Sequence, residues 1–213
     1  MNVRRGAGLV LRITLLAAPL FASDPRFHDE LWVGIEPLYQ KTIDHPFFRA
    51  FLDGTLSQSK FDAYLACETR TRASLAAALT ALAAKAPSEE WRVTLANLRV
   101  GIPTVSEELR TGPFANVARG SFADGLTTIL PHFWIHWELA KDLQKHAIRN
   151  PAHRAWIDQY TNENYRETLS QLIRMMNAQA GRMDAASRER LKPLFATAAR
   201  YEIAQIDEVW KDR

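Results

Sequence analysis

Apolar residues recur along almost the whole chain at intervals of three and four positions, the spacing of one face of an α-helix. Residues 163–180 are an example, with Leu169, Leu172, Ile173 and Met176 on one stripe. The alternating pattern of a β-strand does not occur, and nine glycines and ten prolines are few for 213 residues. The sequence therefore predicts an all-α fold, with roughly seven or eight helices packed on each other.

Glycine, proline and N-capping residues divide this pattern into helices. Ser57 and Ser88 are suited to N-caps, and Gly181 to a helix end. A proline ends the helices before positions 87 and 151. The glycine-rich segment 112–120 is expected to be a loop, preceded by a short segment at 106–111. The predicted helices span residues 27–43, 59–85, 91–99, 122–130, 131–149, 152–160, 163–180 and 185–210.

Two histidines and two tryptophans lie within a few turns of the helix that is predicted to begin at Pro131. Proline suits the first position of a helix, because its missing N–H would have had no partner there. His132 and His136 fall on one stripe, which two leucines continue at helical spacing. Aromatic residues make the neighbouring faces apolar. We therefore expect a central, buried helix whose two imidazoles line a polar pocket.

The first 23 residues differ from the rest of the chain. A basic start leads into an apolar run that is too short to cross a bilayer as a helix. The run is similar to a secretory signal, but Arg12 interrupts it and no small-x-small cleavage site precedes Asp24. We expect residues 1–23 to be either a signal peptide or an N-terminal extension, and residues 24–213 to form one helical domain.

Charge and cysteine content exclude several classes of protein. The net charge is only +3, and no block of five or more Lys and Arg residues occurs, so nucleic-acid binding is not expected. One cysteine excludes an intramolecular disulfide and any multi-cysteine metal site. Cys67 has no base nearby in the sequence, and we interpret it as a structural residue. His45, at a corner before Pro46, is likewise interpreted as structural.

Two glutamates interrupt apolar stripes and are candidates for chemistry. A carboxylate on a buried stripe costs free energy unless it is paired or functional. Glu68 lies on the stripe of the helix predicted over 59–85, and Arg72, four residues later, could instead pair with it on the surface. Glu202 follows a run of small residues on the last helix, where it could simply be exposed. Both alternatives remain open from the sequence.

A metal site at His132 and His136 is the other hypothesis that these residues raise. Di-iron helical bundles use Glu-x-x-His pairs, and many zinc enzymes use His-Glu-x-x-His, but neither pattern occurs here. The sequence therefore predicts pocket-lining histidines without a metal. The carboxylates considered as further ligands are Glu68, Glu108, Glu138, Glu202 and Asp207.

An ordered set of short motifs, from about Phe27 to Trp210, resembles the TenA/thiaminase II family, the helical aminopyrimidine-salvage enzymes of thiamin metabolism. The resemblance implies a heme-oxygenase-like helical bundle, a homotetramer, and a pocket between central helices that needs no cofactor. The matching motifs are His45-Pro46-Phe47, Asp53-Gly54-Thr55-Leu56, Phe61-x-x-Tyr64-Leu65, Ala84-Lys85-Ala86-Pro87, Pro131-x-Phe133-Trp134, Trp156-Ile157-x-x-Tyr160 and Arg200-Tyr201-Glu202.

The resemblance also implies a division of roles in the pocket. In such enzymes a carboxylate binds the pyrimidine, a cysteine attacks the ring, and a C-terminal glutamate moves protons. The pyrimidine-binding carboxylate falls on Glu68, and the proton-moving glutamate on Glu202. These two residues are therefore the expected catalytic residues.

The remaining pocket positions depart from the family pattern. Tyr160 matches directly, whereas the tyrosine one turn after Glu68 falls on Thr71. The nucleophilic cysteine falls on His132, and the tyrosine one turn later on His136. These four residues are expected to bind substrate, but the covalent route is absent at position 132. The segment 101–122 is also about one helix shorter than usual.

Two functional hypotheses follow from this resemblance. The first is an aminopyrimidine hydrolase or thiaminase II-like enzyme that acts on a pyrimidine or a thiamin-like ligand in the cytoplasm. The second is a catalytically inactive protein that binds a small heterocycle or serves as an interaction scaffold. An oxidase on the same bundle is disfavoured by the missing ligand pairs. Export is the alternative to the cytoplasm if residues 1–23 act as a signal peptide.

Overall fold

The computed structural model describes residues 26–99 and 112–211, and within these ranges the chain is helical with no β-strand. The all-α prediction is therefore confirmed. The segments 1–23 and 106–111, and Glu108 within the latter, lie outside the described residues. The elements are α1 (Phe27–Ile43), α2 (Pro46–Asp53), α3 (Gln58–Ala83), α4 (Glu89–Leu98), the 3-10 helix η2 (Gly112–Asn116), α5 (Phe122–Leu143), α6 (Pro151–Thr161), α7 (Glu163–Ala180) and α8 (Ala185–Lys211).

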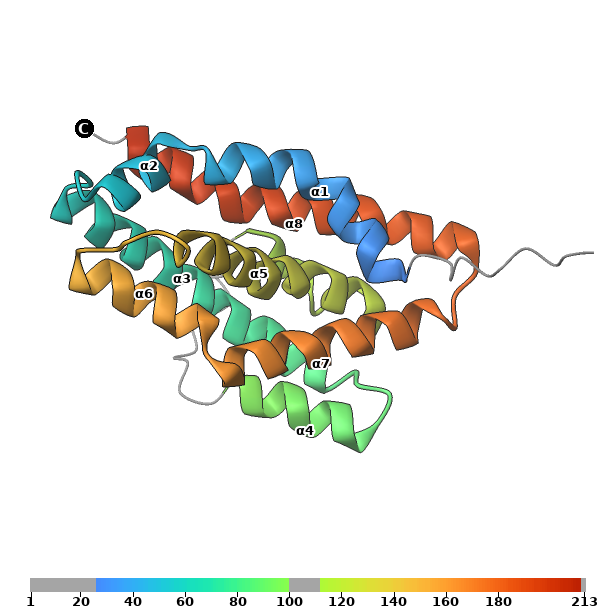
Figure 1. Ribbon diagram of the computed structural model, residues 1–213. Helices are drawn as coiled ribbons and strands as arrows, with labels where there is room; N and C mark the ends of the chain where they lie inside the picture. Colours follow the sequence, from blue (N-terminus) through green and yellow to red (C-terminus); the bar gives the residue numbers. More distant parts are fainter. Residues whose placement is uncertain (1–25, 100–111, 212–213) are drawn as a thin grey trace, which may run out of the picture.

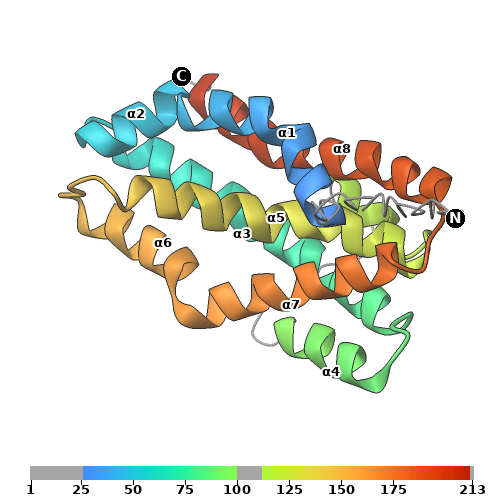
Figure 2. The same cartoon turned by 45° about the vertical axis from the view of Figure 1, so that its right-hand side comes forward.

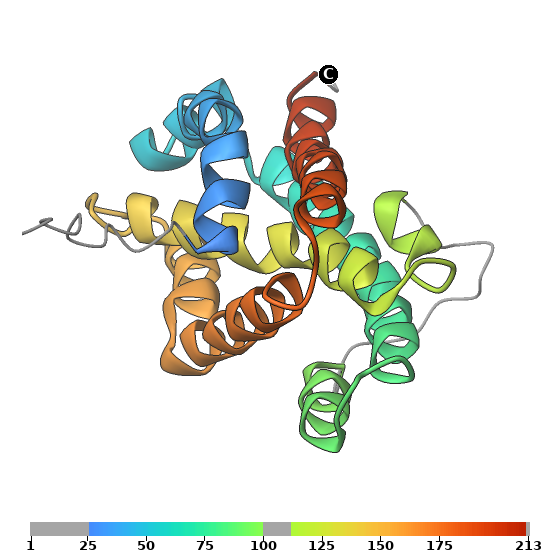
Figure 3. The ribbon, with the colours of Figure 1, turned by 90° about the vertical axis from the view of Figure 1, so that its right-hand side faces the viewer.

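Helix α5 lies at the centre of the bundle and contacts α3, α6, α7 and α8. Helices α1 and α8 run side by side along one side, and α6 and α7 follow the opposite side (Figures 1 and 2). Helix α4 lies apart from the centre, against α3 (Figure 3). Because neighbouring helices surround α5, most of its side chains are buried, as the apolar pattern of its sequence predicts.

The predicted helix start at Pro131 is wrong, because residues 122–130 and 131–143 form one continuous helix. Proline inside a helix removes one backbone hydrogen bond, at a cost of roughly 3 kcal/mol. Burial outweighs that cost here, since Leu126, Ile129, Leu130 and Leu139 are all at most 2% exposed. Fully burying one such side chain stabilises the fold by about 1.5–3 kcal/mol. The true start is at Phe122, where Ser121 accepts a hydrogen bond from the backbone N–H of the third helical residue.

Most other helix limits agree with the predicted ones. Ser57 and Ser88 cap the N-termini of α3 and α4 through their hydroxyl oxygens, and α7 ends at Gly181. The predicted helix at 131–149 is too long, because α5 ends at Leu143. The segment 112–120 is not entirely a loop, since η2 occupies its first half.

The corner at His45 contains a short helix that the sequence pattern did not predict. Nδ1 of His45 accepts a hydrogen bond from the backbone N–H of Phe47, which caps α2. Its Nε2 lies 3.1 Å from a carboxylate oxygen of Asp207 on α8. The structural interpretation of His45 is therefore consistent with both of its ring contacts. No helix in the described ranges is long and apolar enough to cross a membrane.

Candidate active site

Three helices bring carboxylates and aromatic donors to the histidine stripe of α5. Helix α3 supplies Glu68, α6 supplies Tyr160, and α8 supplies Glu202. Glu68 is 8% exposed and Glu202 is 7% exposed, while His132 and His136 are 4% and 5% exposed. The two surface alternatives for the glutamates are therefore wrong: both carboxylates are buried against imidazoles.

Glu68 is the centre of a hydrogen-bonded cluster. Its Oε1 lies 2.9 Å from Nε2 of His136 and accepts a hydrogen bond of 3.1 Å from the indole N–H of Trp156. Its Oε2 is 3.2 Å from the same indole nitrogen and accepts a hydrogen bond of 3.3 Å from the hydroxyl of Tyr160. A carboxylate offers about four acceptor sites. These donors come close to saturating Glu68.

The cluster around Glu68 holds an ion pair. Nδ1 of His136 lies 2.7 Å from the carbonyl oxygen of His132, and Nε2 faces the Glu68 carboxylate. Donation to two acceptors requires a proton on both nitrogens, so His136 is an imidazolium. Burial works against both charges, but the hydrogen bond and charge of the partner outweigh it. The pKa of Glu68 is consequently below its ordinary value, and the pKa of His136 is above its ordinary value.

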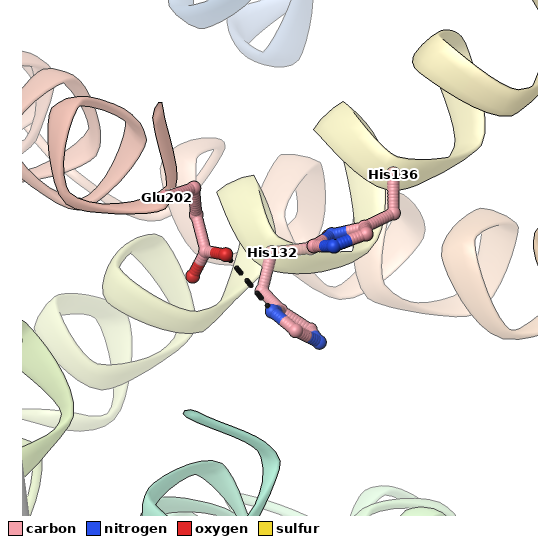
Figure 4. Close-up of side chains that lie close together, drawn as sticks. All are labelled: His132, His136 and Glu202. Carbon is pink, nitrogen blue, oxygen red and sulfur yellow. Dashed lines mark hydrogen bonds and ion pairs between the residues drawn. The ribbon is translucent and has the colours of Figure 1, made fainter. Parts of the chain in front are cut away.

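The second carboxylate, Glu202, has a different environment. Its Oε2 lies 3.2 Å from Nδ1 of His132, and both side chains are buried (Figure 4). Its Oε1 is also buried, and among the described residues it is the one buried side-chain oxygen or nitrogen without a hydrogen-bond partner. A buried polar atom without a partner costs about 1–3 kcal/mol. Such an atom is expected at a place where a ligand, water or proton is handled.

A cavity of about 350 Å³ opens beside the histidine stripe. His132, Phe133, Tyr160 and Tyr165 contribute to its wall from α5, α6 and the start of α7. Burial, followed by the negative charge of Glu68, raises the pKa of both tyrosines well above 10, so their hydroxyls stay protonated as donors. The rest of the wall is formed by Arg72, Leu75, Leu98, Gln159, Asn162, Asn164 and Thr168.

Thr71 is separated from the other predicted substrate-binding residues. Its hydroxyl donates a hydrogen bond of 2.7 Å to the side-chain oxygen of Gln205 on α8. Together with Cys67 it lines a different cavity, of about 250 Å³, between α3 and α8. Cys67 lies 2.9 Å from a guanidinium nitrogen of Arg70, away from the Glu68 carboxylate, as its position one residue earlier on the helix predicts.

The structure adds one residue to the candidate site, Trp156. In the sequence, Trp156 is recognisable only as part of a motif, whereas in the structure its indole N–H bonds to both oxygens of Glu68. The signal that could have identified it is that a buried tryptophan usually finds a partner for its N–H. Conversely, Glu138 lies outside the site, since it is paired with Lys141 on the surface of α5.

His132, His136 and Glu202 also lie close enough together to raise the question of a metal ion. Their nearest donor atoms are all within 4.8 Å of one another. Both ring nitrogens of His136 are already in hydrogen bonds. We therefore interpret this arrangement as a hydrogen-bonded network rather than as a set of metal ligands.

Comparison with known proteins places this architecture among its relatives. Residues 114–211 match the model of the TENA/THI-4/PQQC family. Aminopyrimidine aminohydrolase from Halalkalibacterium halodurans is 23% identical over 88% of this chain and 96% of its own length. Thiamine biosynthesis multifunctional protein ThiED from Corynebacterium efficiens is 25% identical over 77% of this chain, which corresponds to 26% of that longer protein.

Solved structures show the same fold at low sequence identity. A TenA homologue from P. horikoshii OT3 superposes with a TM-score of 0.73 and 21% identity, covering 87% of this chain and 99% of that one. A TenA homologue from Pyrococcus furiosus has a TM-score of 0.75 and 17% identity, covering 86% and 99% of the two chains.

The fold and the site define a class: an all-α bundle whose central helix carries two imidazoles, each bonded to a buried carboxylate, beside a cavity. Within that class, the chain is similar to the TenA/thiaminase II family, through the family model over residues 114–211, the aminopyrimidine aminohydrolase relative and the TenA-like fold. The resemblance of the short motifs to this family is therefore confirmed.

Proposed function

We propose that the protein is an aminopyrimidine hydrolase of thiamin salvage that binds a pyrimidine in the cavity beside α5. The observation that carries this proposal is the partnerless, buried Oε1 of Glu202 beside His132, a residue of the cavity wall. The names of the relatives, an aminopyrimidine aminohydrolase and a thiamine biosynthesis protein, supply the substrate class.

The chemistry needs a group that handles protons next to a flat binding space. In the reaction the oxygen of a water molecule forms a bond to the substrate carbon, while the bond from that carbon to the amino nitrogen breaks. One proton leaves the water and one reaches the departing nitrogen, so an amine and water become an alcohol and ammonia. The hydrogen-bonded pair of Glu202 and His132 is the proposed source of this proton handling, because one oxygen of Glu202 is not yet engaged.

The walls of the cavity suit a small aromatic ring with polar edges. Phe133, Tyr160 and Tyr165 supply aromatic surface, and amide side chains of α6 and α7 supply hydrogen bonds. Glu68 does not itself line the cavity, but it accepts a hydrogen bond from Tyr160 of the cavity wall and is the proposed anchor of the pyrimidine. The amino group of the ligand would replace the hydroxyl of Tyr160, whose hydrogen bond to that carboxylate is long at 3.3 Å.

A second candidate function is binding of a small heterocycle without turnover. The observation that favours it is the near saturation of Glu68 by His136, Trp156 and Tyr160, which leaves little acceptor capacity for a ligand. Thr71 also bonds to Gln205, outside the cavity, so it adds no surface for stacking.

The test is to incubate the full chain with aminomethylpyrimidine, and separately with thiamin, and to follow the release of hydroxymethylpyrimidine. We expect turnover, and we expect Glu202→Gln to lower kcat by about 100- to 10,000-fold. Glu138→Gln is the matched control, because it removes a carboxylate of α5 that is paired with Lys141 at the surface. Thermal stabilisation by either ligand without any turnover would reject the enzyme and favour the binding protein.

We further propose a homotetramer located in the cytoplasm, as the family resemblance implies. Light scattering coupled to size-exclusion chromatography measures the first property. Intact mass of the protein from its native host measures the second, since loss of residues 1–23 would indicate export.

A further inference from the structure

We propose that His132 is the general base of the reaction, and that Glu202 acts through it as a positioning residue. This inference rests on the hydrolase activity proposed above and separates the roles of two residues within it. His132 was expected only to bind substrate, at the position where the resemblance implies a nucleophilic cysteine. The inference replaces covalent attack at this position with activation of water.

The two nitrogens of the His132 ring have different surroundings. Nδ1 lies 3.2 Å from Oε2 of Glu202, and a carboxylate at this distance holds the ring proton on Nδ1. The lone pair is then on Nε2, which points away from Glu202 (Figure 4). His132 lines the cavity, whereas Glu202 does not. A water molecule in the cavity can therefore contact the imidazole of His132 but not the carboxylate of Glu202.

His136, one turn later on the same face of α5, cannot take this role. Its two nitrogens face the carbonyl oxygen of His132 and the carboxylate of Glu68, and both carry protons. It has no lone pair to accept a further proton. The two histidines therefore have different roles. His136 donates a hydrogen bond that holds Glu68 in place, and His132 can accept a proton.

Charged groups surround His132 and act on its imidazole in opposite directions. Glu202 attracts the imidazolium form, while the positive charge of His136, with ring centroids 4.6 Å apart, opposes it. Arg72 on α3 also lines the cavity and opposes protonation. Tyr160 on α6 and Tyr165 on α7 face the cavity as protonated hydroxyls.

The reaction balances with this assignment. Nε2 of His132 takes a proton from the attacking water as the new carbon–oxygen bond forms and the carbon–nitrogen bond breaks. The imidazolium then gives the proton from Nε2 to the departing nitrogen, which leaves as ammonia. Through its contact with Nδ1, the Glu202 carboxylate holds the tautomer of His132 and stabilises the transient positive charge. Its partnerless Oε1 lies in the same buried carboxylate and adds to that stabilisation.

The decisive variant is His132→Asn, because the asparagine amide keeps a donor near the position of Nδ1 and lacks Nε2. With aminomethylpyrimidine as the substrate, we expect kcat to fall by about 100- to 10,000-fold while KM changes little. His146→Asn, at an exposed histidine, is the matched control. In His132→Gly, added imidazole should restore part of the turnover. His132→Asn with nearly wild-type kcat would overturn the inference and leave the proposed hydrolase intact.

The pH profile separates a positioning role from a direct one. Wild-type kcat should decline on the acid side, where Nε2 is protonated, and His132→Asn should lack that limb. Glu202→Gln should keep the limb but move it to lower pH, because the imidazolium loses a stabilising charge. An unshifted limb in Glu202→Gln would overturn the role of Glu202. Turnover that is lost with EDTA and restored by Zn²⁺ would overturn general-base catalysis by His132 in favour of a metal.

A measurement that needs no turnover distinguishes failure of this inference from failure of the proposed function. Nitrogen-15 NMR of the histidine rings should show a proton on Nδ1 and a lone pair on Nε2 of His132 at neutral pH. A proton on Nε2 instead would overturn the inference whatever the substrate. If the predicted tautomer is observed but the protein turns over neither aminomethylpyrimidine nor thiamin, the proposed hydrolase activity is rejected. The proposed role of His132 as a base is then rejected with it.

Discussion

The two buried carboxylates of the site contact different histidines of one stripe of α5, and they differ in how many hydrogen bonds they receive. Glu68 receives donors from His136, Trp156 and Tyr160. Glu202 has one oxygen bonded to His132, and its other oxygen has no partner among the residues that the structure describes. The first carboxylate holds three helices in register, whereas the second retains capacity for a ligand or a proton. Stability should therefore depend more on Glu68, whereas Glu202 belongs with His132 to the proposed proton chemistry.

The largest expected contrast is in the free energy of unfolding. Glu68→Gln removes the partner of a buried imidazolium and should cost roughly 3–5 kcal/mol, the range for breaking a buried ion pair. Glu202→Gln removes a charge with a partnerless oxygen, and should change the stability by less than about 1 kcal/mol. Urea denaturation of the two variants measures the difference. Equal losses would show that Glu202 is also a structural anchor.

The effect of Glu68→Gln on the free energy of unfolding should also depend on pH, within a defined range. His136 has a raised pKa in the folded state, so its contribution is complete below the ordinary histidine value of 6.5 and is lost as the pH rises through the folded value. Glu68 has a lowered pKa, so its contribution is complete above the ordinary value of 4.5 and is lost as the pH falls through the folded value.

The difference in the free energy of unfolding between the wild type and Glu68→Gln should therefore be largest between about pH 4.5 and 6.5. It should become smaller at lower and at higher pH. Urea denaturation at a series of pH values gives the curve. A difference that grew steadily from pH 6.5 to 9 would contradict the ion pair. Glu202→Gln, measured in the same buffers, is the control for effects of pH on the remainder of the protein.

The donors to Glu68 provide a smaller contrast. Trp156→Phe removes the one indole N–H that reaches both carboxylate oxygens. A hydrogen bond to a charged group contributes about 1.5–3 kcal/mol, and we expect a loss in that range. Trp91→Phe is the control, since Trp91 stacks on Phe122 far from the carboxylate and loses only ring area. Equal losses of stability in the two variants would mean that packing of the Trp156 ring, rather than its hydrogen bond to Glu68, stabilises the fold.

Much of the fold could be predicted because helix limits depend on local chemistry. The limits of α7 follow from a helical stripe closed by Gly181, and the start of α3 follows from the hydroxyl of Ser57. Pro131 misled the prediction because a local rule favours proline at a helix start. The burial that keeps α5 continuous comes from surrounding helices, which no local pattern contains.

The site could be predicted only up to the choice of partners. The stripe that joins His132 and His136 follows from helical geometry, and so does the departure of Cys67 from the face of Glu68. Trp156, however, is separated from Glu68 by 88 positions, and its contact depends on how α6 packs against α5. The same packing of helices determines which histidine is hydrogen-bonded to which carboxylate. Spacing along one helix therefore identified the pocket but not its hydrogen bonds.

The smallest expected effect concerns two tyrosines of the same cavity. Tyr160 donates a hydrogen bond of 3.3 Å to Glu68, whereas Tyr165 donates one of 3.2 Å to the backbone carbonyl of Phe133. Tyr160→Phe should lose roughly 1 kcal/mol of stability, because the bond to the carboxylate is long and other donors remain. It should also leave the Glu68 carboxylate more open to the amino group of a pyrimidine.

Tyr165→Phe is the matched control, since it removes a hydroxyl from the same cavity without touching Glu68. If the pyrimidine replaces the Tyr160 hydroxyl, Tyr160→Phe should bind aminomethylpyrimidine at least as tightly as the wild type. Tyr165→Phe removes no donor from Glu68, so its affinity should not be preserved by this mechanism. Isothermal titration calorimetry measures both. A marked loss of affinity in Tyr160→Phe would mean that this hydroxyl contacts the ligand directly, and that Glu68 stays saturated when the pyrimidine is bound.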